Sequence, residues 1–139
     1  MTASSDRLLR RTLWGNAAFS VVSGAGLAVL AGPFARAAAS APVSVLGLDL
    51  AILFELLGLG VVAFGALCAW AASRETLPQG LARLIFAADI AWVAGSVLVL
   101  ALPASWTTAG IAGIVVVALI VADFVILEYL GLRRIGTAN

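Results

Sequence analysis

Residues 106–130 read WTTAGIAGIVVVALIVADFVILEYL, an apolar run interrupted by two acidic residues. A helix of about 20 apolar residues spans the roughly 30 Å hydrocarbon core of a bilayer, so this run is long enough to cross a membrane. The apolar residues are continuous rather than alternating, and a segment in lipid must satisfy its own backbone groups, which favours a helix over a strand. The stretch therefore predicts a transmembrane helix.

Three further apolar runs have similar lengths, and Arg or Pro residues stand near their ends. Together the four runs predict a single all-α domain over residues 1–139, an integral membrane four-helix bundle with little chain outside the bilayer. The expected spans are residues 12–32, 50–72, 81–102 and 106–130, with a loop over residues 34–49 and a tight turn over residues 103–105.

The composition supports a membrane protein and argues against most familiar chemistry. Apolar residues make up 63% of the chain and charged residues 11%, with a mean hydropathy of +1.15. Soluble domains carry about 25% charged residues. The net charge of +1 gives no basic stripe for nucleic acid. With no His, no Lys and a single Cys, we expect no catalytic residue, metal site or cofactor.

The distribution of Arg residues predicts the orientation. Cytoplasmic loops carry an excess of Lys and Arg, and seven of the eight Arg residues here fall on one side of the expected spans. The sequence therefore predicts a cell (inner) membrane protein with both termini in the cytoplasm. That side holds Arg7, Arg10, Arg11, Arg74, Arg83, Arg133 and Arg134, and the opposite side holds Arg36.

The N-terminal region has a second interpretation. An Arg-rich start, an apolar core and the small-residue triplets at residues 37–39 and 39–41 resemble a cleavable signal peptide. The apolar stretch is nevertheless long enough to span a bilayer. We therefore expect an uncleaved first helix.

Five polar side chains fall inside the expected spans: Asn16, Glu55, Asp89, Asp123 and Glu128. Polar groups in a membrane are costly, which makes them candidate functional residues. Asp89 and Asp123 lie deepest, about 9 Å and 15 Å inward from the nearest Arg residues of their helices. Glu55 and Glu128 lie nearer the span ends and are expected to reach the headgroups. The structural alternative is a hydrogen-bond network that fixes helix register.

A weak internal repeat relates the first and third spans. A shift of 73 residues places Asn16 on Asp89, Phe19 on Trp92 and Ser23 on Ser96. The spacing puts each set on one helical face. The repeat predicts two helical hairpins in the same orientation, with Asn16 donating a hydrogen bond to Asp89.

Small residues are a further packing signal. Ala87, Ala91 and Gly95 recur at every fourth position of the third span, and Gly24 and Gly58 thin the first two. Small residues let helix backbones approach each other in lipid. We expect this packing inside the bundle, with a homodimer face as the alternative.

The whole chain resembles small four-helix bacterial inner-membrane proteins, loosely of the DoxX-like kind. The resemblance rests on the Arg-rich start, the stretch from Arg83 to Ser96 with its core Ala-Asp-Ile-Ala-Trp, and the ending Gly-Leu-Arg-Arg at residues 131–134. It implies the fold but no activity. Small multidrug-resistance exporters match less well, because they carry an essential Glu in the first helix, where this chain has Asn16.

Three hypotheses for function follow. The first is an accessory or interaction subunit, or a binder of a lipid-like molecule, with membrane lipids, a homo-oligomer or a larger membrane complex as partners. The second is a small proton-coupled transporter that uses Asp89 and Asp123 as a protonatable relay. The third, which the missing nucleophiles and bases disfavour, is a membrane enzyme acting on a lipid or quinone.

Overall fold

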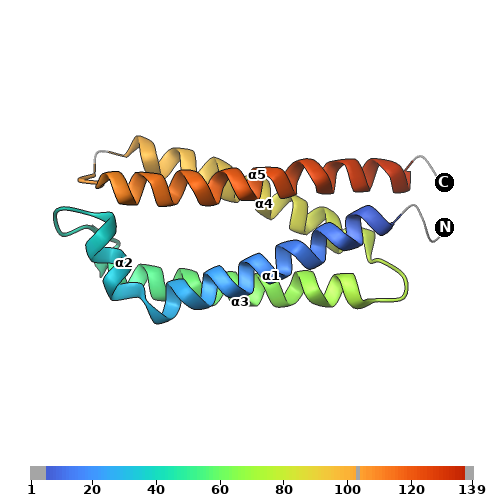
Figure 1. The fold of residues 1–139 in the computed structure, drawn as a ribbon, viewed down its shortest axis with the longest axis horizontal. Helices are drawn as coiled ribbons and strands as arrows, with labels where there is room; N and C mark the ends of the chain where they lie inside the picture. Colours follow the sequence, from blue (N-terminus) through green and yellow to red (C-terminus); the bar gives the residue numbers. More distant parts are fainter. Residues whose placement is uncertain (1–5, 103, 137–139) are drawn as a thin grey trace.

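The structure is a computed structural model that describes residues 6–102 and 104–136. It confirms the all-α bundle, with four helices long and apolar enough to cross a membrane (Figure 1). These are α1 (Arg7–Val29), α3 (Leu50–Ser73), α4 (Gln79–Ala101) and α5 (Thr108–Gly136). The first begins earlier and the last ends later than the expected spans, because their Arg-containing turns continue the helix. Pro103, in the expected tight turn, lies outside the described residues.

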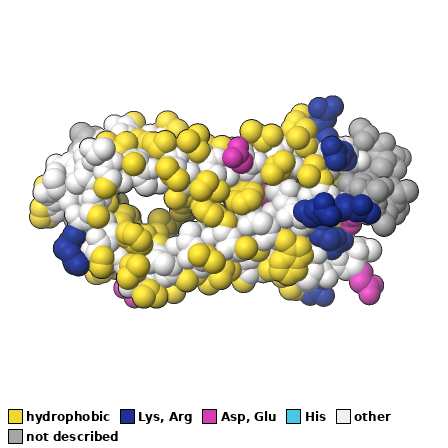
Figure 2. Space-filling view, in the orientation of Figure 1, with side chains coloured by type: hydrophobic (Ala, Val, Ile, Leu, Met, Phe, Trp, Pro, Cys, Tyr) yellow, Lys and Arg dark blue, Asp and Glu magenta, His cyan; other side chains and the backbone are white. Residues whose placement is uncertain are grey.

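The four long helices form two hairpins. α1 packs along α3, α4 packs along α5, and the hairpins meet mainly where α1 touches α5. Both hairpins start at the same end of the molecule, so they have the same orientation, as the repeat predicts (Figure 1). Basic side chains gather at that end, which we call the Arg-rich end (Figure 2). The opposite end is called the α2 end.

The prediction of a loop over residues 34–49 is wrong in part, because this segment contains regular secondary structure. It holds part of α2 (Ala31–Ala38) and a two-stranded antiparallel ribbon of β1 (Ser44–Val45) and β2 (Leu48–Asp49). Pro33 lies in the first turn of α2, where its missing N–H costs no helix hydrogen bond. Leu46 and Gly47 turn the ribbon with φ angles of 54° and 80°, the backbone that a tight hairpin turn requires.

The α2 end is closed by a junction between α2 and the start of α5. The backbone N–H of Thr107 donates to the carbonyl of Ala38 at 2.9 Å, and that of Ser40 donates to Ser105 at 2.9 Å. Gly110 lies directly against the backbone of Ala38, where a Cβ would overlap it. The glycine is therefore needed for this close approach.

Glycines also set the crossing of α1 and α3, as the sequence predicts. A Cβ on Gly58 would lie 2.5 Å from the backbone nitrogen of Ala28, and one on Gly24 would lie 2.7 Å from the carbonyl of Gly58. The expectation for α4 is wrong. Ala87 and Ala91 are exposed, and a Cβ on Gly95 would meet nothing within 4 Å, so that stripe faces away from the bundle.

The fully packed core lies at the Arg-rich end. Its members come from distant parts of the sequence because the start of α1, the end of α5 and the α3–α4 loop meet there (Figure 1). The cluster contains Leu9, Leu13, Ala17, Cys68, Ala71, Ala72, Leu77, Ala82, Ile85 and Ile135.

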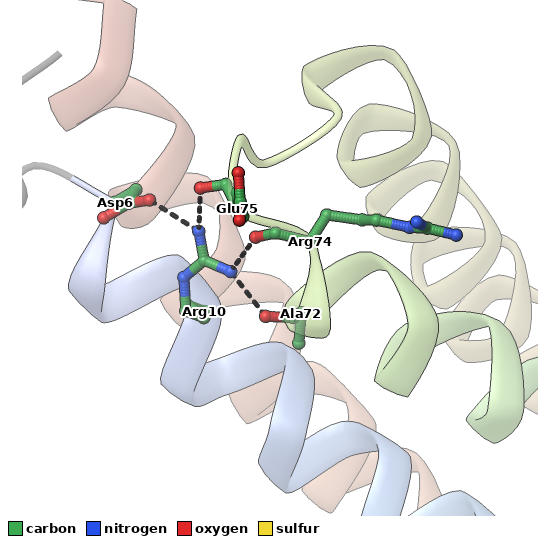
Figure 3. A network of polar contacts seen from close by, with 5 residues as sticks. All are labelled: Asp6, Arg10, Ala72, Arg74 and Glu75. Carbon is green, nitrogen blue, oxygen red and sulfur yellow. Dashed lines mark hydrogen bonds and ion pairs between the residues drawn. The ribbon is translucent and has the colours of Figure 1, made fainter.

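Arg10 fastens α1 to the end of α3 (Figure 3). Its guanidinium donates to the backbone carbonyls of Ala72, Arg74 and Glu75 and pairs with Asp6 at 2.9 Å. The last carbonyls of a helix lack partners within the helix and carry partial negative charge, so a cation stabilises them. Arg10, which the sequence associates only with orientation, thus closes the Arg-rich end.

Candidate functional site

Three polar side chains from three helices meet inside the bundle. Asn16 of α1, Asp89 of α4 and Glu128 of α5 are 1%, 4% and 0% exposed. The Nδ2 of Asn16 donates to Oδ2 of Asp89 at 2.5 Å and to Oε1 of Glu128 at 3.2 Å. The predicted hydrogen bond from Asn16 to Asp89 is confirmed, and Glu128 is an additional acceptor. We call these three residues the polar cluster.

Two more buried side chains adjoin the polar cluster. Ser20, one turn along α1, donates to Oδ1 of Asn16 at 3.1 Å, so both the N–H and the carbonyl groups of that amide are engaged. The thiol of Cys68 on α3 is fully buried and lies near both carboxyl groups. All four long helices therefore contribute. The sequence could have pointed to Ser20 as a site residue, because it follows Asn16 by four residues on the same helical face. No sequence pattern points to Cys68.

The prediction for Glu128 is wrong. The position of Arg133, five residues later, predicts that Glu128 reaches the headgroups, but its side chain points toward α1 and α4 and is completely buried. Depth along the helix and direction around it are independent quantities, and only the first can be counted from a single sequence.

The two carboxyl groups of the polar cluster also contact each other. Asp89 and Glu128 are close enough to interact directly. Oε2 of Glu128 is buried and has no hydrogen-bond partner among the described residues. A protonated carboxyl is a donor as well as an acceptor, so a proton on one of the two groups would let it donate a hydrogen bond. The polar cluster thus contains a buried carboxyl oxygen that has no partner among the described residues.

Asp123 and Glu55 do not join this site. Asp123 is exposed, because five residues separate it from Glu128 and turn it to nearly the opposite face of α5. The relay hypothesis requires Asp123 to lie beside Asp89, and the structure does not place it there. Glu55 is exposed on α3, in the second turn from the α2 end.

The repeated stripes continue from the polar cluster toward the α2 end. Phe19, Ser23, Trp92 and Ser96 are all partly buried. The hydroxyl of Ser23 donates to the carbonyl of Phe19 at 2.6 Å, and that of Ser96 donates to the carbonyl of Trp92 at 2.9 Å. The two helices thus repeat the same local hydrogen bond, and both hydroxyls are satisfied within their own helix.

Beyond the polar cluster the hairpins separate. α1 and α4 are not packed along each other, and the surface between the two hairpins is hollowed in the half nearer the α2 end (Figure 2). We call this opening the window. The polar cluster bounds it on one side and the α2–α5 junction on the other. Ser23 and Ser96 lie on the helical faces of Asn16 and Asp89, which are the faces that meet across it.

A separate cavity of about 420 Å³ lies at the α2 end, between α2, the following loop and the first turn of α3. Arg36 and Asp49 are its charged lining residues. None of its lining residues belongs to the polar cluster.

Comparison of the chain with protein-family models, with curated proteins and with solved structures found no match. The polar cluster and the window are therefore the features of the fold that bear on function.

Proposed function

We propose that the protein binds the hydrocarbon chain of a lipid-like molecule in the window, as an accessory or interaction subunit of the cell (inner) membrane with both termini in the cytoplasm. The observation that carries the proposal is the separation of the two hairpins beyond the polar cluster (Figure 2). The excess of Arg at one end supports the orientation.

The chemistry of the window favours an apolar occupant. The hydroxyls of Ser23 and Ser96 already donate to carbonyls of their own helices, and among the described residues of the two stripes only the indole N–H of Trp92 is a donor without a partner. Hydrophobic side chains stand along part of the visible edge of the opening (Figure 2). A water molecule is held inside a protein only where it has two to four polar partners. An opening with such walls in the hydrocarbon region is filled by lipid chains or by protein.

Photo-crosslinking tests this proposal. The full chain is reconstituted in vesicles that contain a phospholipid with a diazirine in its acyl chain, and labelled peptides are mapped by mass spectrometry. We expect labelling concentrated on the facing stretches of α1 and α4 around Ser23 and Ser96. Ser96→Trp, which fills the window, should reduce that labelling several-fold. Ala87→Trp, on the outward face of the same helix, should leave it unchanged. Labelling spread evenly over all four helices would contradict the proposal.

The polar cluster supports a second candidate, a proton-coupled carrier. The contact between Asp89 and Glu128 favours it. Glu128 then takes the role in the protonatable relay that the sequence analysis assigns to Asp123. Proton flux into vesicles tests it. Glu128→Gln should abolish the flux, and Asp123→Asn should retain it. Absence of flux from the unaltered protein would dismiss this candidate and leave the lipid-binding proposal standing.

A further inference from the structure

The cavity at the α2 end is lined by two side chains of opposite charge that do not pair with each other. Arg36 has no hydrogen bond or ion pair within the described residues, and its guanidinium lies beside Gly32, where a Cβ would be 3.4 Å from Nη1. Asp49 is the N-cap of α3 and accepts a hydrogen bond from the backbone N–H of Ile52 at 2.9 Å, and no described cation pairs with it. The cavity therefore presents one positive and one negative group to a ligand.

The cavity lies at the depth of the lipid headgroups. α3 has 24 residues, or about 36 Å of helix, which exceeds the roughly 30 Å hydrocarbon core, so its end turns reach the headgroup layers. Leu50 and Ala51 of its first turn line the cavity. The ribbon of β1 and β2 that leads into this turn has an apolar tip, with Leu46 97% and Val45 47% exposed. Such surface is more favourable against lipid than in water, so the ribbon places the cavity at the surface of the bilayer.

We propose that this cavity binds the headgroup of a phospholipid that carries a primary ammonium, with the phosphate on Arg36 and the ammonium on Asp49. A guanidinium matches a phosphate through two parallel N–H···O bonds. A primary ammonium has three N–H donors, and a carboxylate accepts them while balancing the charge. The volume of about 420 Å³ falls within the range of small-molecule sites, about 300–1,000 Å³. None of the lining residues belongs to the stripes beside the window, so the proposal does not rest on lipid binding there.

The lining distinguishes this headgroup from the other common classes. Asp49 repels a headgroup whose only charge is a phosphate. A quaternary ammonium has no N–H to donate and is recognised by the faces of aromatic rings, and none of the described residues that line the cavity is aromatic. Most of the lining residues other than Arg36 and Asp49 are Gly or Ala, which leave room for the short chain between phosphate and ammonium. The charges and the space therefore both favour an ethanolamine-type headgroup.

Lipid retention by the full chain tests the proposal. The protein is held in detergent micelles with phosphatidylethanolamine, phosphatidylcholine or phosphatidylglycerol, and bound lipid is counted by native mass spectrometry. We expect phosphatidylethanolamine to bind at least fivefold more tightly than either of the other two. The preference among headgroups is the readout, because binding of a hydrocarbon chain in the window does not depend on the headgroup. Equal binding of the three lipids overturns the proposal.

Two variants separate the roles of the charges. Arg36→Gln should weaken binding of phosphatidylethanolamine at least fivefold, whereas Arg11→Gln, which alters an exposed Arg at the other end, should not change it. Asp49→Asn keeps a residue that caps a helix as well as Asp does, and it should let phosphatidylglycerol bind at least as well as phosphatidylethanolamine. Circular dichroism checks that the variants retain their helix content. Unchanged binding by Arg36→Gln, or an unchanged preference in Asp49→Asn, overturns the proposal.

Two further measurements distinguish the cavity from surface charge and a lipid from a soluble ligand. Ala51→Trp fills the cavity without changing its charge and should weaken binding at least fivefold, and Ala87→Trp, on the exposed face of α4, should not. Glycerophosphoethanolamine, which has the same two charges without acyl chains, should not displace the lipid at equal concentration. Displacement would assign the cavity to a soluble phosphate ester, and full binding by Ala51→Trp would place the headgroup elsewhere; either result overturns the proposal.

Discussion

The two ends of this bundle are built from similar apolar helices but are packed in different ways. At the Arg-rich end all four long helices meet around a continuous core, and Arg10 ties α1 to the end of α3 (Figure 3). Toward the α2 end α1 and α3 stay closely packed at Gly24 and Gly58, but the two hairpins separate and leave the window (Figure 2). Close packing inside a hairpin therefore does not require close packing between hairpins.

We call the half of the bundle at the Arg-rich end the closed half, and the half that contains the window the open half. The polar cluster lies where these two halves meet. In lipid, apolar surface alone gives helices no reason to prefer each other over hydrocarbon chains, so packing and hydrogen bonds decide which contacts persist. Among the described residues, Asn16 supplies the two hydrogen bonds that join α1 to the second hairpin at this depth. We infer that this amide holds the two hairpins together at the border of the window.

The largest expected effect is loss of this connection. Asn16→Leu removes the donor for two buried carboxyl groups, and an unsatisfied buried group costs about 1–3 kcal/mol. We expect a loss of about 3 kcal/mol in the free energy of unfolding, measured by titration with denaturing detergent. Ser23→Ala is the control, because the Ser23 hydroxyl donates its hydrogen bond to a carbonyl of its own helix, and this variant should change stability by less than about 0.5 kcal/mol. Equal effects of the two variants would show that the amide does not join the hairpins.

Much of the closed half could be predicted from the sequence. Four continuous apolar runs are enough to predict four helices, and the shared spacing of Asn16 and Asp89 within their helices predicts their hydrogen bond. Glu128 could not be placed in the same way. Its partners lie on two other helices, and the rotation of α5 about its axis depends on the packing of all of them.

The open half was harder to predict. Pro33 looks like the end of a span, because Pro terminates helices, yet it starts α2 instead. Gly24 and Gly95 look alike in sequence, but one is enclosed by α3 and the other faces outward. Small residues indicate that close approach is allowed; only the three-dimensional arrangement determines which of them have a neighbour.

The second prediction compares two glycines two residues apart on α3. Gly58→Val places a Cβ against backbone atoms of Ala28 and Gly24, which cannot move without separating the helices. Overpacking of this kind costs about 1–3 kcal/mol, and we expect about 2 kcal/mol in detergent titration. Gly60→Val meets nothing within 4 Å and should be nearly neutral. If Gly60→Val were the more disruptive variant, the crossing of α1 and α3 would lie elsewhere.

The third prediction concerns the Arg-rich end. Arg10→Ala removes the donors to the carbonyls that end α3, and because the side chain is partly exposed we expect a loss of about 1 kcal/mol. Hydrogen exchange should rise mainly in residues 72–76 and at the start of α1. Arg11→Ala, an exposed neighbour on α1, serves as the matched control and should not change exchange there. Faster exchange at the α2 end instead would indicate that Arg10 does not act locally.

The smallest expected effect is in the window. Ser96→Leu adds an apolar side chain where the hairpins are apart, so it should change the free energy of unfolding by less than about 0.5 kcal/mol. Ala82→Leu makes the same helix bulkier in the closed half, where residue 82 is fully buried, and overpacking there should cost about 1–3 kcal/mol. The difference between the free energies of unfolding of these two variants of α4 measures how much more closely the closed half is packed than the open half. A Ser96→Leu protein as unstable as Ala82→Leu would mean that the hairpins are closed against each other in the membrane, and that lipid has no access between them.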